Sequence, residues 1–298
     1  MPSDVNSQFN VQIISTKNII RSKNLESKLT ELGLKFQISP GVVLNEIDFH
    51  AGLLHSAFLT KLICQRNLSI GEVGCALAHR NAINNFLNSD HKFGIIFEDD
   101  AEVIAEFNFD VIKKVLDSNL PIVIVLGWIP GFAIAKNPQV LLSEEPIELI
   151  TAPTCAFAYA INRPAAKLMI GSHEKIIDLP DWPIYTLNKV NFYSTHSPWV
   201  TANHDPKFST IGERSIPISG SPISVLVSRI RLASSLVALI ALSKTNKLDV
   251  SPRQIVHWLL RGMLYKYGLT QVNEKSTTNK VIPLPLKFQK LLILLKLS

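Results

Sequence analysis

A chain of 298 residues that is 47% hydrophobic and 18% charged has ample length and apolar content for one large or two modest domains. Global disorder is excluded, and three cysteines without a C-x-x-C pair exclude a disulfide scaffold and a cysteine-built zinc finger and favour a reducing compartment. The N-terminus lacks the basic start and apolar run of a secretory signal. The longest apolar run near the C-terminus, residues 232–243, is too short to cross a bilayer, so we expect no membrane-spanning segment.

The first seventy residues predict a β-α-β unit followed by an irregular stretch. Residues 10–16 predict a strand, residues 24–32 an amphipathic helix that stops at Gly33, and residues 34–39 a second strand. Such an opening favours an α/β fold with a parallel sheet. Residues 40–68 are poorly patterned and predict loop with short helix.

A capping box marks the start of the next predicted helix. Ser69 stands at the N-cap and Glu72 at position N3, where each side chain can satisfy the other residue's backbone N–H. We expect this helix to run to about Asn88. The residues expected on its buried side are Val73, Leu77, Ala78, Ala82, Phe86 and Leu87.

The remaining core elements alternate between strands and helices. Strands are predicted at residues 93–97, 121–126, 147–152, 156–161 and 191–195. Helices are predicted at residues 109–117, between Asn162 and Gly171, and after Asp181, which stands at a predicted N-cap. Residues 198–221 predict ordered loop.

The composition changes near residue 222. Residues 222–298 carry 12 lysines and arginines against two acidic residues, whereas residues 1–221 have a net charge of −4. Amphipathic helices are predicted at residues 223–242, 253–267 and 287–297. We place a domain boundary near residue 221 and expect the basic helical region either to dock on an anionic membrane surface or to pack as a cap on the core. No known motif accompanies the basic charge, so binding to nucleic acid is not expected.

The sequence FGIIFEDDA places three carboxylates, Glu98, Asp99 and Asp100, directly after a buried strand. Charges this close repel one another and are costly near a core unless a cation neutralises them. Ligands of open α/β sheets bind at the carboxyl ends of strands, where this cluster is expected. On an extended backbone Glu98 and Asp100 point to the same side, which favours a shared site for Mg²⁺ or Mn²⁺. The alternative is a solvated acidic turn that caps the next helix.

Two segments together resemble glycosyltransferase family 25: residues 69–79 (SIGEVGCALAH) and residues 95–101 (IIFEDDA). The family contains bacterial lipooligosaccharide and lipopolysaccharide glycosyltransferases, and its pattern is roughly (T/S)-x-G-E-x-G-C-x-x-S-H followed by (I/L)-L-E-D-D. Here Ala78 replaces the usual serine and Phe97 the usual leucine. Weaker similarity extends the resemblance to about residues 10–215, through residues 14–21, 157–166, 178–182 and 209–212.

The resemblance implies a GT-A type, Rossmann-like nucleotide-sugar-binding domain over residues 1–221. It also implies a UDP-sugar donor, most often UDP-galactose, and a divalent metal ion, Mn²⁺ or Mg²⁺. Within that frame Asp100 is expected to bind the metal, and Glu98 or Asp99 to contact the nucleotide ribose or metal-bound water. A metal on the diphosphate would stabilise the charge that develops on the leaving nucleotide.

Arg21, Glu72 and His79 are expected at the donor site on the same grounds. Each also has a structural explanation: an exposed arginine at a helix start, the capping box, and a structural helical histidine, respectively. His204, late in the core, is expected as a third metal ligand, with an exposed loop histidine as the alternative.

Asp181 is expected to be the base that deprotonates the acceptor hydroxyl. Asp178, nearby in the sequence, is the alternative candidate for this base. A structural function is also possible for Asp181, because an aspartate at this position could cap the following helix without taking part in catalysis.

The resemblance thus implies a metal-dependent galactosyltransferase of bacterial cell-surface glycan assembly that acts by single displacement with inversion. The acceptor is expected to be a lipid-linked or free oligosaccharide of the lipooligosaccharide type, and the protein to be peripheral at the cytoplasmic face of the inner membrane. Two alternatives stay open: transfer from another UDP-hexose, and a catalytically inactive membrane-associated partner in glycan assembly.

Overall fold

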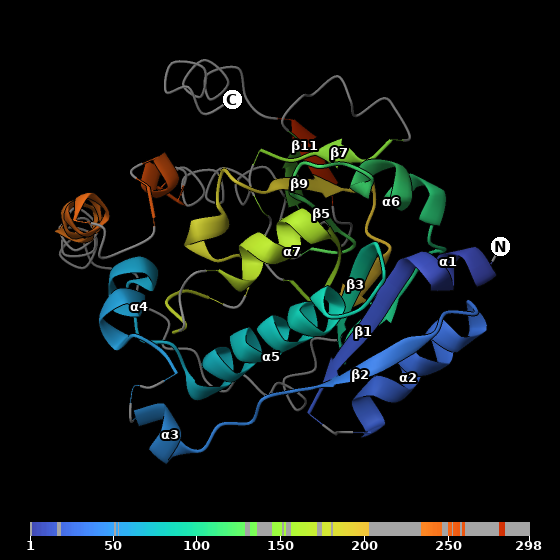
Figure 1. Cartoon of the computed structure of the whole chain (residues 1–298), viewed down its shortest axis with the longest axis horizontal. Coiled ribbons are helices and arrows are strands. Elements are labelled where there is room, and N and C mark those ends of the chain that lie inside the picture. Colours follow the sequence, from blue (N-terminus) through green and yellow to red (C-terminus); the bar gives the residue numbers. More distant parts are fainter. Residues whose placement is uncertain are drawn as a thin grey trace.

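The structure is a computed structural model of the whole chain (Figure 1). It describes residues 2–16, 19–50, 52, 54–128, 132–135, 145–150, 152, 156–171, 175–179, 181–202, 234–245, 250–251, 253–256, 258–259 and 280–283. Among the helices of these residues, none combines the length and apolar character needed to cross a bilayer.

A seven-stranded sheet with the order β2-β1-β3-β8-β5-β9-β7 forms the centre of the fold. Its strands are β1 (Phe9–Ser15), β2 (Phe36–Pro40), β3 (Phe93–Glu98), β5 (Ile122–Val125), β7 (Ile147–Glu148), β8 (Ala158–Asn162) and β9 (Asn191–Ser194). β1 pairs in parallel with β2 and β3, and β5 with β9. β8 runs antiparallel to both β3 and β5, and β7 antiparallel to β9. The α/β class is therefore confirmed, but the expected parallel sheet is mixed, because β8 enters between β3 and β5 in the opposite direction.

Two small sheets were not predicted. β4 (Ala101–Val103) pairs antiparallel with β10 (Val200–Ala202), inside a stretch expected to be loop. β6 (Phe132–Ala135) pairs in parallel with β11 (Lys280–Pro283). These strands have three or four residues, which is too short for an alternating pattern to identify.

Helices cover both faces of the large sheet. The described helices are α1 (Pro2–Gln8), α2 (Ile19–Glu31), α3 (Glu46–His50), α4 (Ala57–Cys64), α5 (Ile70–Leu87), α6 (Phe109–Leu116) and α7 (Arg163–Ile170). Of these, α2 and α6 pack on one face of the sheet, and α5 and α7 on the other. The helices predicted over 109–117 and between Asn162 and Gly171 are confirmed, and Asn162 caps α7 by accepting the N–H of Ala165. α2 begins five residues earlier than predicted, and α1 was not predicted.

The alternation of side chains along the strands builds two cores. On β3, Ile96 packs among residues of α5 and α7, whereas Ile95 and Phe97 pack on the opposite face among residues of α2 and α6. The result is three layers, with α5 and α7 lying across one face of the sheet (Figure 1). On α5, Leu77 and Leu87 are half-buried, while Val73, Ala78, Ala82 and Phe86 are buried as predicted.

Part of the region after residue 222 packs on the core. Residues 234–244 are helical, and Leu239, Val250 and Ile255 join a buried cluster with Ile184 and Leu187. Gln254, fully buried, donates a hydrogen bond to the carbonyl oxygen of Tyr185. The rest of this region lies largely outside the described residues, including the predicted helix over 287–297. The boundary near residue 221 stays a prediction.

Candidate functional site

A cavity of about 410 Å³ lies where β1, β2 and β3 end. The loop after β2 contributes residues 41–44, the end of β3 contributes Glu98 and Asp99, and the first half of α5 contributes Gly74 and Cys75. We call this the α5 cavity. It lies at the carboxyl ends of parallel strands, the usual binding place of open α/β sheets, and its volume is within the range of small-molecule sites.

Gly74 allows α5 to approach the wall of this cavity closely. A Cβ atom at this position would lie 2.3 Å from the carbonyl oxygen of Val42, a distance at which backbone atoms would have to move. Any side chain at Gly74 would therefore push the 41–44 loop away from α5 and change the shape of the cavity.

The three carboxylates after β3 lie in different environments. β3 ends at Glu98, and Asp99 and Asp100 form a turn before β4, so the extended backbone assumed from the sequence is wrong for this pair. Asp99 is buried and accepts a hydrogen bond from the Ser15 hydroxyl, with 3.0 Å between the oxygens. Glu98 and Asp100 are half-buried.

His79 joins Glu98 to the core. The imidazole is buried, with Nε2 3.1 Å from Glu98 Oε1 and Nδ1 3.2 Å from the Tyr159 hydroxyl. The Tyr159 ring is stacked on the imidazole and has no exposed surface. Burial and the negative charge of Glu98 raise the pKa of Tyr159 well above its usual value, so its hydroxyl keeps its proton at physiological pH.

Cys75 lies one helical turn before His79, and several carboxylates act on its thiol. Burial is the largest cause that raises the Cys75 pKa, followed by the negative charges of Glu98, Asp181, Asp100 and Glu72. Asp100 and Asp181 are about eighty residues apart in the sequence. The fold places both, with Glu98, near enough for their negative charges to raise the pKa of one thiol.

The loop that carries Asp181 is organised by Asp178. Asp178 is buried, and its carboxylate accepts the backbone N–H groups of Leu179 at 2.7 Å and Ile184 at 2.8 Å and the Cys64 thiol at 3.4 Å. The predicted N-cap at Asp181 is wrong: within described residues 181–190, helical structure is limited to a 3₁₀ turn over Ile184–Thr186, which has Pro183 at its N-cap and no side-chain cap. Asp178 therefore stabilises this loop through its hydrogen bonds, and helix capping is excluded as the function of Asp181.

Trp182 anchors the same loop by packing into the hydrophobic core. It is almost completely buried, and its ring makes edge contacts with Tyr159 at 5.4 Å and with Phe192 at 5.0 Å between centroids. Asp181 is thus held between a buried indole and the turn closed by Asp178.

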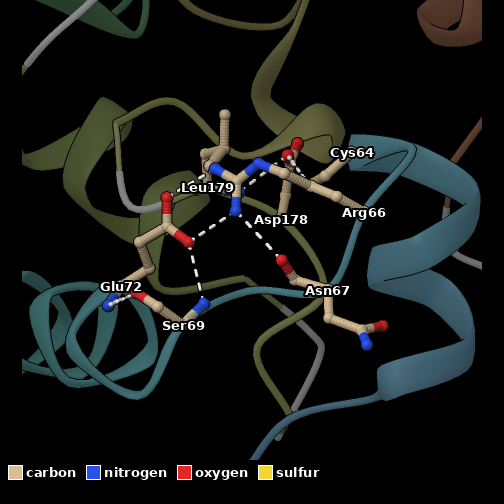
Figure 2. A network of polar contacts seen from close by, with 7 residues as sticks. All are labelled: Cys64, Arg66, Asn67, Ser69, Glu72, Asp178 and Leu179. Atoms are coloured by element: carbon tan, nitrogen blue, oxygen red, sulfur yellow. Dashed lines mark hydrogen bonds and ion pairs between the residues drawn. The ribbon is translucent and has the colours of Figure 1, made fainter. Parts of the chain in front are cut away.

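Glu72 belongs to a network at the start of α5 (Figure 2). The predicted capping box with Ser69 is confirmed. Both Glu72 oxygens also accept hydrogen bonds from Arg66, at 2.5 and 2.7 Å, and Arg66 donates a further bond to the Asn67 carbonyl. The Glu72 carboxylate raises the pKa of Arg66, and only 2% of the Glu72 side chain is exposed. These bonds give Glu72 a structural function, and its donor-binding function stays a prediction.

Arg66→Ala should destabilise the protein by roughly 3–5 kcal/mol, because it leaves a buried carboxylate without its cation. Lys92→Ala provides the control: Lys92 pairs with Asp117 at 2.7 Å, but both side chains are more than half exposed, and such pairs contribute about 1 kcal/mol or less. Urea unfolding measures both changes. Equal shifts in the two variants would show that the Arg66–Glu72 pair is not a buried structural pair.

The remaining candidates are only partly described. Arg21 lies in α2, but the structure does not describe its side chain, and His204 lies outside the described residues. Sequence analysis gave no function to Cys75, Tyr159 or Arg66. The four-residue spacing of Cys75 and His79 on one helix face was the available signal for the first of these; Tyr159 and Arg66 reach the site only through tertiary packing.

Comparison with known proteins gives one family. Residues 9–128 match the model of glycosyltransferase family 25 (LPS biosynthesis protein). No curated protein sequence matches the chain. Two solved structures are similar at low levels. The crystal structure of A197 from STIV has 12% identity and a TM-score of 0.38 and covers 72% of this chain and 98% of its own. A glycosyltransferase involved in glycosylation of the major capsid of PBCV-1 has 10% identity and a TM-score of 0.28, covering 54% and 63%.

Proposed function

We propose, from the match of residues 9–128 to the model of glycosyltransferase family 25, that the protein transfers a hexose from a UDP-sugar to a glycan acceptor of the lipooligosaccharide or lipopolysaccharide type. The observation that carries the proposal is the coincidence of the matched segment with the α5 cavity. The lining residues given above all fall within residues 9–128. We propose UDP-galactose as the donor, with another UDP-hexose as the alternative.

The donor would occupy the α5 cavity. Asp99, fixed by Ser15, and the neighbouring Glu98 lie on its wall and offer carboxylate oxygens to ribose hydroxyls. His79 lies behind Glu98 and holds its carboxylate in place. Arg21 is proposed to contact the donor phosphates, since its helix α2 follows β1 and a guanidinium suits phosphate.

The donor set also fits a hard divalent cation, which we propose to be Mn²⁺ or Mg²⁺. Asp100 would hold it, with His204 as a further ligand. Carboxylate oxygens are the ligands that such ions prefer, and the half-buried carboxylates of Glu98 and Asp100, two residues apart, would otherwise repel each other. When bound, the ion would supply positive charge that stabilises the diphosphate of the leaving UDP.

Asp181 is proposed as the base. Its carboxylate would take the proton of the acceptor hydroxyl as the hydroxyl oxygen forms a bond to the anomeric carbon and the bond from that carbon to the UDP oxygen breaks. Attack from the side opposite UDP inverts the anomeric configuration. Two observations support this. The negative charge of Asp181 raises the pKa of the Cys75 thiol, as do the charges of Glu98 and Asp100. The loop that carries Asp181 is anchored by the hydrogen bonds of Asp178 and by the buried Trp182.

Basic residues between 222 and 298 are proposed to attract the protein to an anionic membrane surface at the cytoplasmic face, near a lipid-linked acceptor. Because Leu239, Val250 and Ile255 belong to a buried cluster, removal of the whole region would expose apolar core and would not test membrane binding alone. Lys287→Glu combined with Lys290→Glu is a cleaner variant, and it should weaken co-sedimentation with anionic vesicles at low salt.

Hydrolysis of UDP-sugars by the purified full-length protein tests the proposed function. We expect release of UDP from one UDP-hexose in a panel, stimulated by Mn²⁺ and lost on chelation. If another UDP-hexose is hydrolysed fastest, the assignment of UDP-galactose as the donor is wrong, but the protein is still a glycosyltransferase. Absence of both UDP binding and hydrolysis would contradict the transferase and support an inactive partner in glycan assembly.

A further inference from the structure

We propose that Cys75, His79 and Glu98 form a binding site for a transition metal ion of the Zn²⁺ class in the wall of the α5 cavity. One ligand atom from each residue lies within 4.8 Å of the others. This site goes beyond the proposed function, because it adds a thiolate and an imidazole to a carboxylate and is separate from the hard cation assigned to Asp100.

The measured distances are close to those of a metal site. Tetrahedral zinc, with bonds of about 2.3 Å to sulfur and about 2.0 Å to nitrogen or oxygen, places its ligand atoms roughly 3.3–3.6 Å apart. His79 Nε2 lies 3.1 Å and Cys75 Sγ 4.0 Å from Glu98 Oε1. Cys75 Sγ and His79 Nε2 lie within 4.8 Å of each other, so shifts of up to about 1.5 Å in side-chain position would form the site.

The elements that carry the ligands hold them in register. Cys75 and His79 lie one turn apart on α5, so their side chains project from the same face of the helix. Glu98 is the last residue of β3, against which α5 packs. The Tyr159 hydroxyl contacts His79 Nδ1, which leaves Nε2 for the ion, an arrangement that is common at histidine metal ligands.

The chemistry of the three ligands selects the ion. Cys75 is a protonated thiol in the metal-free protein, and binding of the ion displaces its proton to solvent. The resulting thiolate and the imidazole prefer Zn²⁺ and Co²⁺, whereas Mg²⁺ and Mn²⁺ prefer oxygen alone. Negative charge from Asp100 and Asp181 acts at the same place and attracts a cation. Because Cys75 and Glu98 line the α5 cavity, the ion has a path of entry and room for water as a fourth ligand.

Titration of the full-length protein with Co²⁺ tests the site by its spectrum. We expect one equivalent to give a thiolate-to-cobalt charge-transfer band in the near ultraviolet and visible bands of tetrahedral intensity. Zn²⁺ should remove these bands, and Mg²⁺ should not. Cys75→Ser should abolish the charge-transfer band, while Cys64→Ser, a half-buried thiol bound to Asp178, should keep it. Tyr159→Phe should weaken Co²⁺ binding by at least about tenfold.

A second measurement needs no substitution and covers the case in which Cys75→Ser does not fold. X-ray absorption at the zinc edge of the wild-type protein with one equivalent of Zn²⁺ should require one sulfur neighbour at about 2.3 Å. Bands that persist in folded Cys75→Ser, or a zinc shell without sulfur, would overturn the site. None of these measurements involves sugar transfer, so their failure leaves the proposed function intact, and an inactive enzyme leaves the metal site testable.

Discussion

Replacing Asp100 with asparagine should lower the rate of sugar transfer by at least ~10²-fold and leave the fold unchanged. Asparagine keeps the size and hydrogen bonding of the side chain but removes its charge. The loss of a charge that places a cation on the leaving diphosphate corresponds to several kcal/mol of transition-state stabilisation. The change is measured as Mn²⁺-dependent release of UDP, with circular dichroism and thermal unfolding to confirm the fold.

Asp110→Asn is the matched control for this variant. Asp110 undergoes the same substitution ten residues further along the chain, but it is exposed in the first turn of α6, so activity should stay within about twofold, in keeping with the small effects of surface substitutions. Near-normal turnover of Asp100→Asn, or an equal loss in both variants, would contradict the function assigned to Asp100.

Asp181→Asn should abolish transfer to an acceptor while leaving the affinity for UDP-sugar nearly unchanged. The base acts only on the acceptor hydroxyl, and loss of a general base costs about 10²–10⁴-fold in rate. Donor affinity is measured by calorimetry and transfer by the formation of glycosylated acceptor. A parallel collapse of donor affinity would make Asp181 a donor-binding residue, and unchanged transfer would remove it from catalysis.

Asp178→Asn separates catalysis from loop structure. Its carboxylate accepts two backbone N–H groups, one on each oxygen, and an asparagine amide nitrogen cannot replace the second acceptor. We expect a loss of roughly 1.5–3 kcal/mol in the free energy of unfolding, as for hydrogen bonds to charged groups. Asp181→Asn, by contrast, keeps both of these hydrogen bonds, so we expect it to unfold at a higher denaturant concentration than Asp178→Asn.

Local signals in the sequence were sufficient for most helices and central strands. The capping box of Ser69 and Glu72 located the start of α5, and the Asn162–Gly171 pair located both ends of α7, because these residues act through bonds within one or two turns. The run FGIIF was identifiable as β3 because a strand covered on both faces is continuously apolar.

Strand direction and strand order required tertiary information. β8 has the same apolar character as its neighbours, and no local pattern shows that it runs antiparallel between β3 and β5. The same limit explains the error at Asp181. Asp178 and Asp181 are both compatible with capping by sequence, and only the fold shows that the Asp178 carboxylate reaches Ile184 six residues later.

Part of the candidate site could also be predicted from the sequence, namely the part whose residues are neighbours in the chain. Glu98, Asp99 and Asp100 are adjacent in sequence, so their gathering at the end of β3 could be predicted. The approach of Asp181 to Cys75 depends on the packing of Trp182 against Tyr159, which joins segments more than twenty residues apart.

The place of β8 in the sheet also has a consequence for biosynthesis. β3 ends at residue 98 and β8 at residue 162, so the ribosome adds 64 residues before β3 obtains its second neighbour. At roughly 5–20 residues per second, this interval lasts about 3–13 s. During that time β3, and later β5, present apolar, unpaired edges of the kind on which nascent chains aggregate. Chaperone capture in this window, more than the stability of the finished fold, would then govern the yield of soluble protein in a recombinant host.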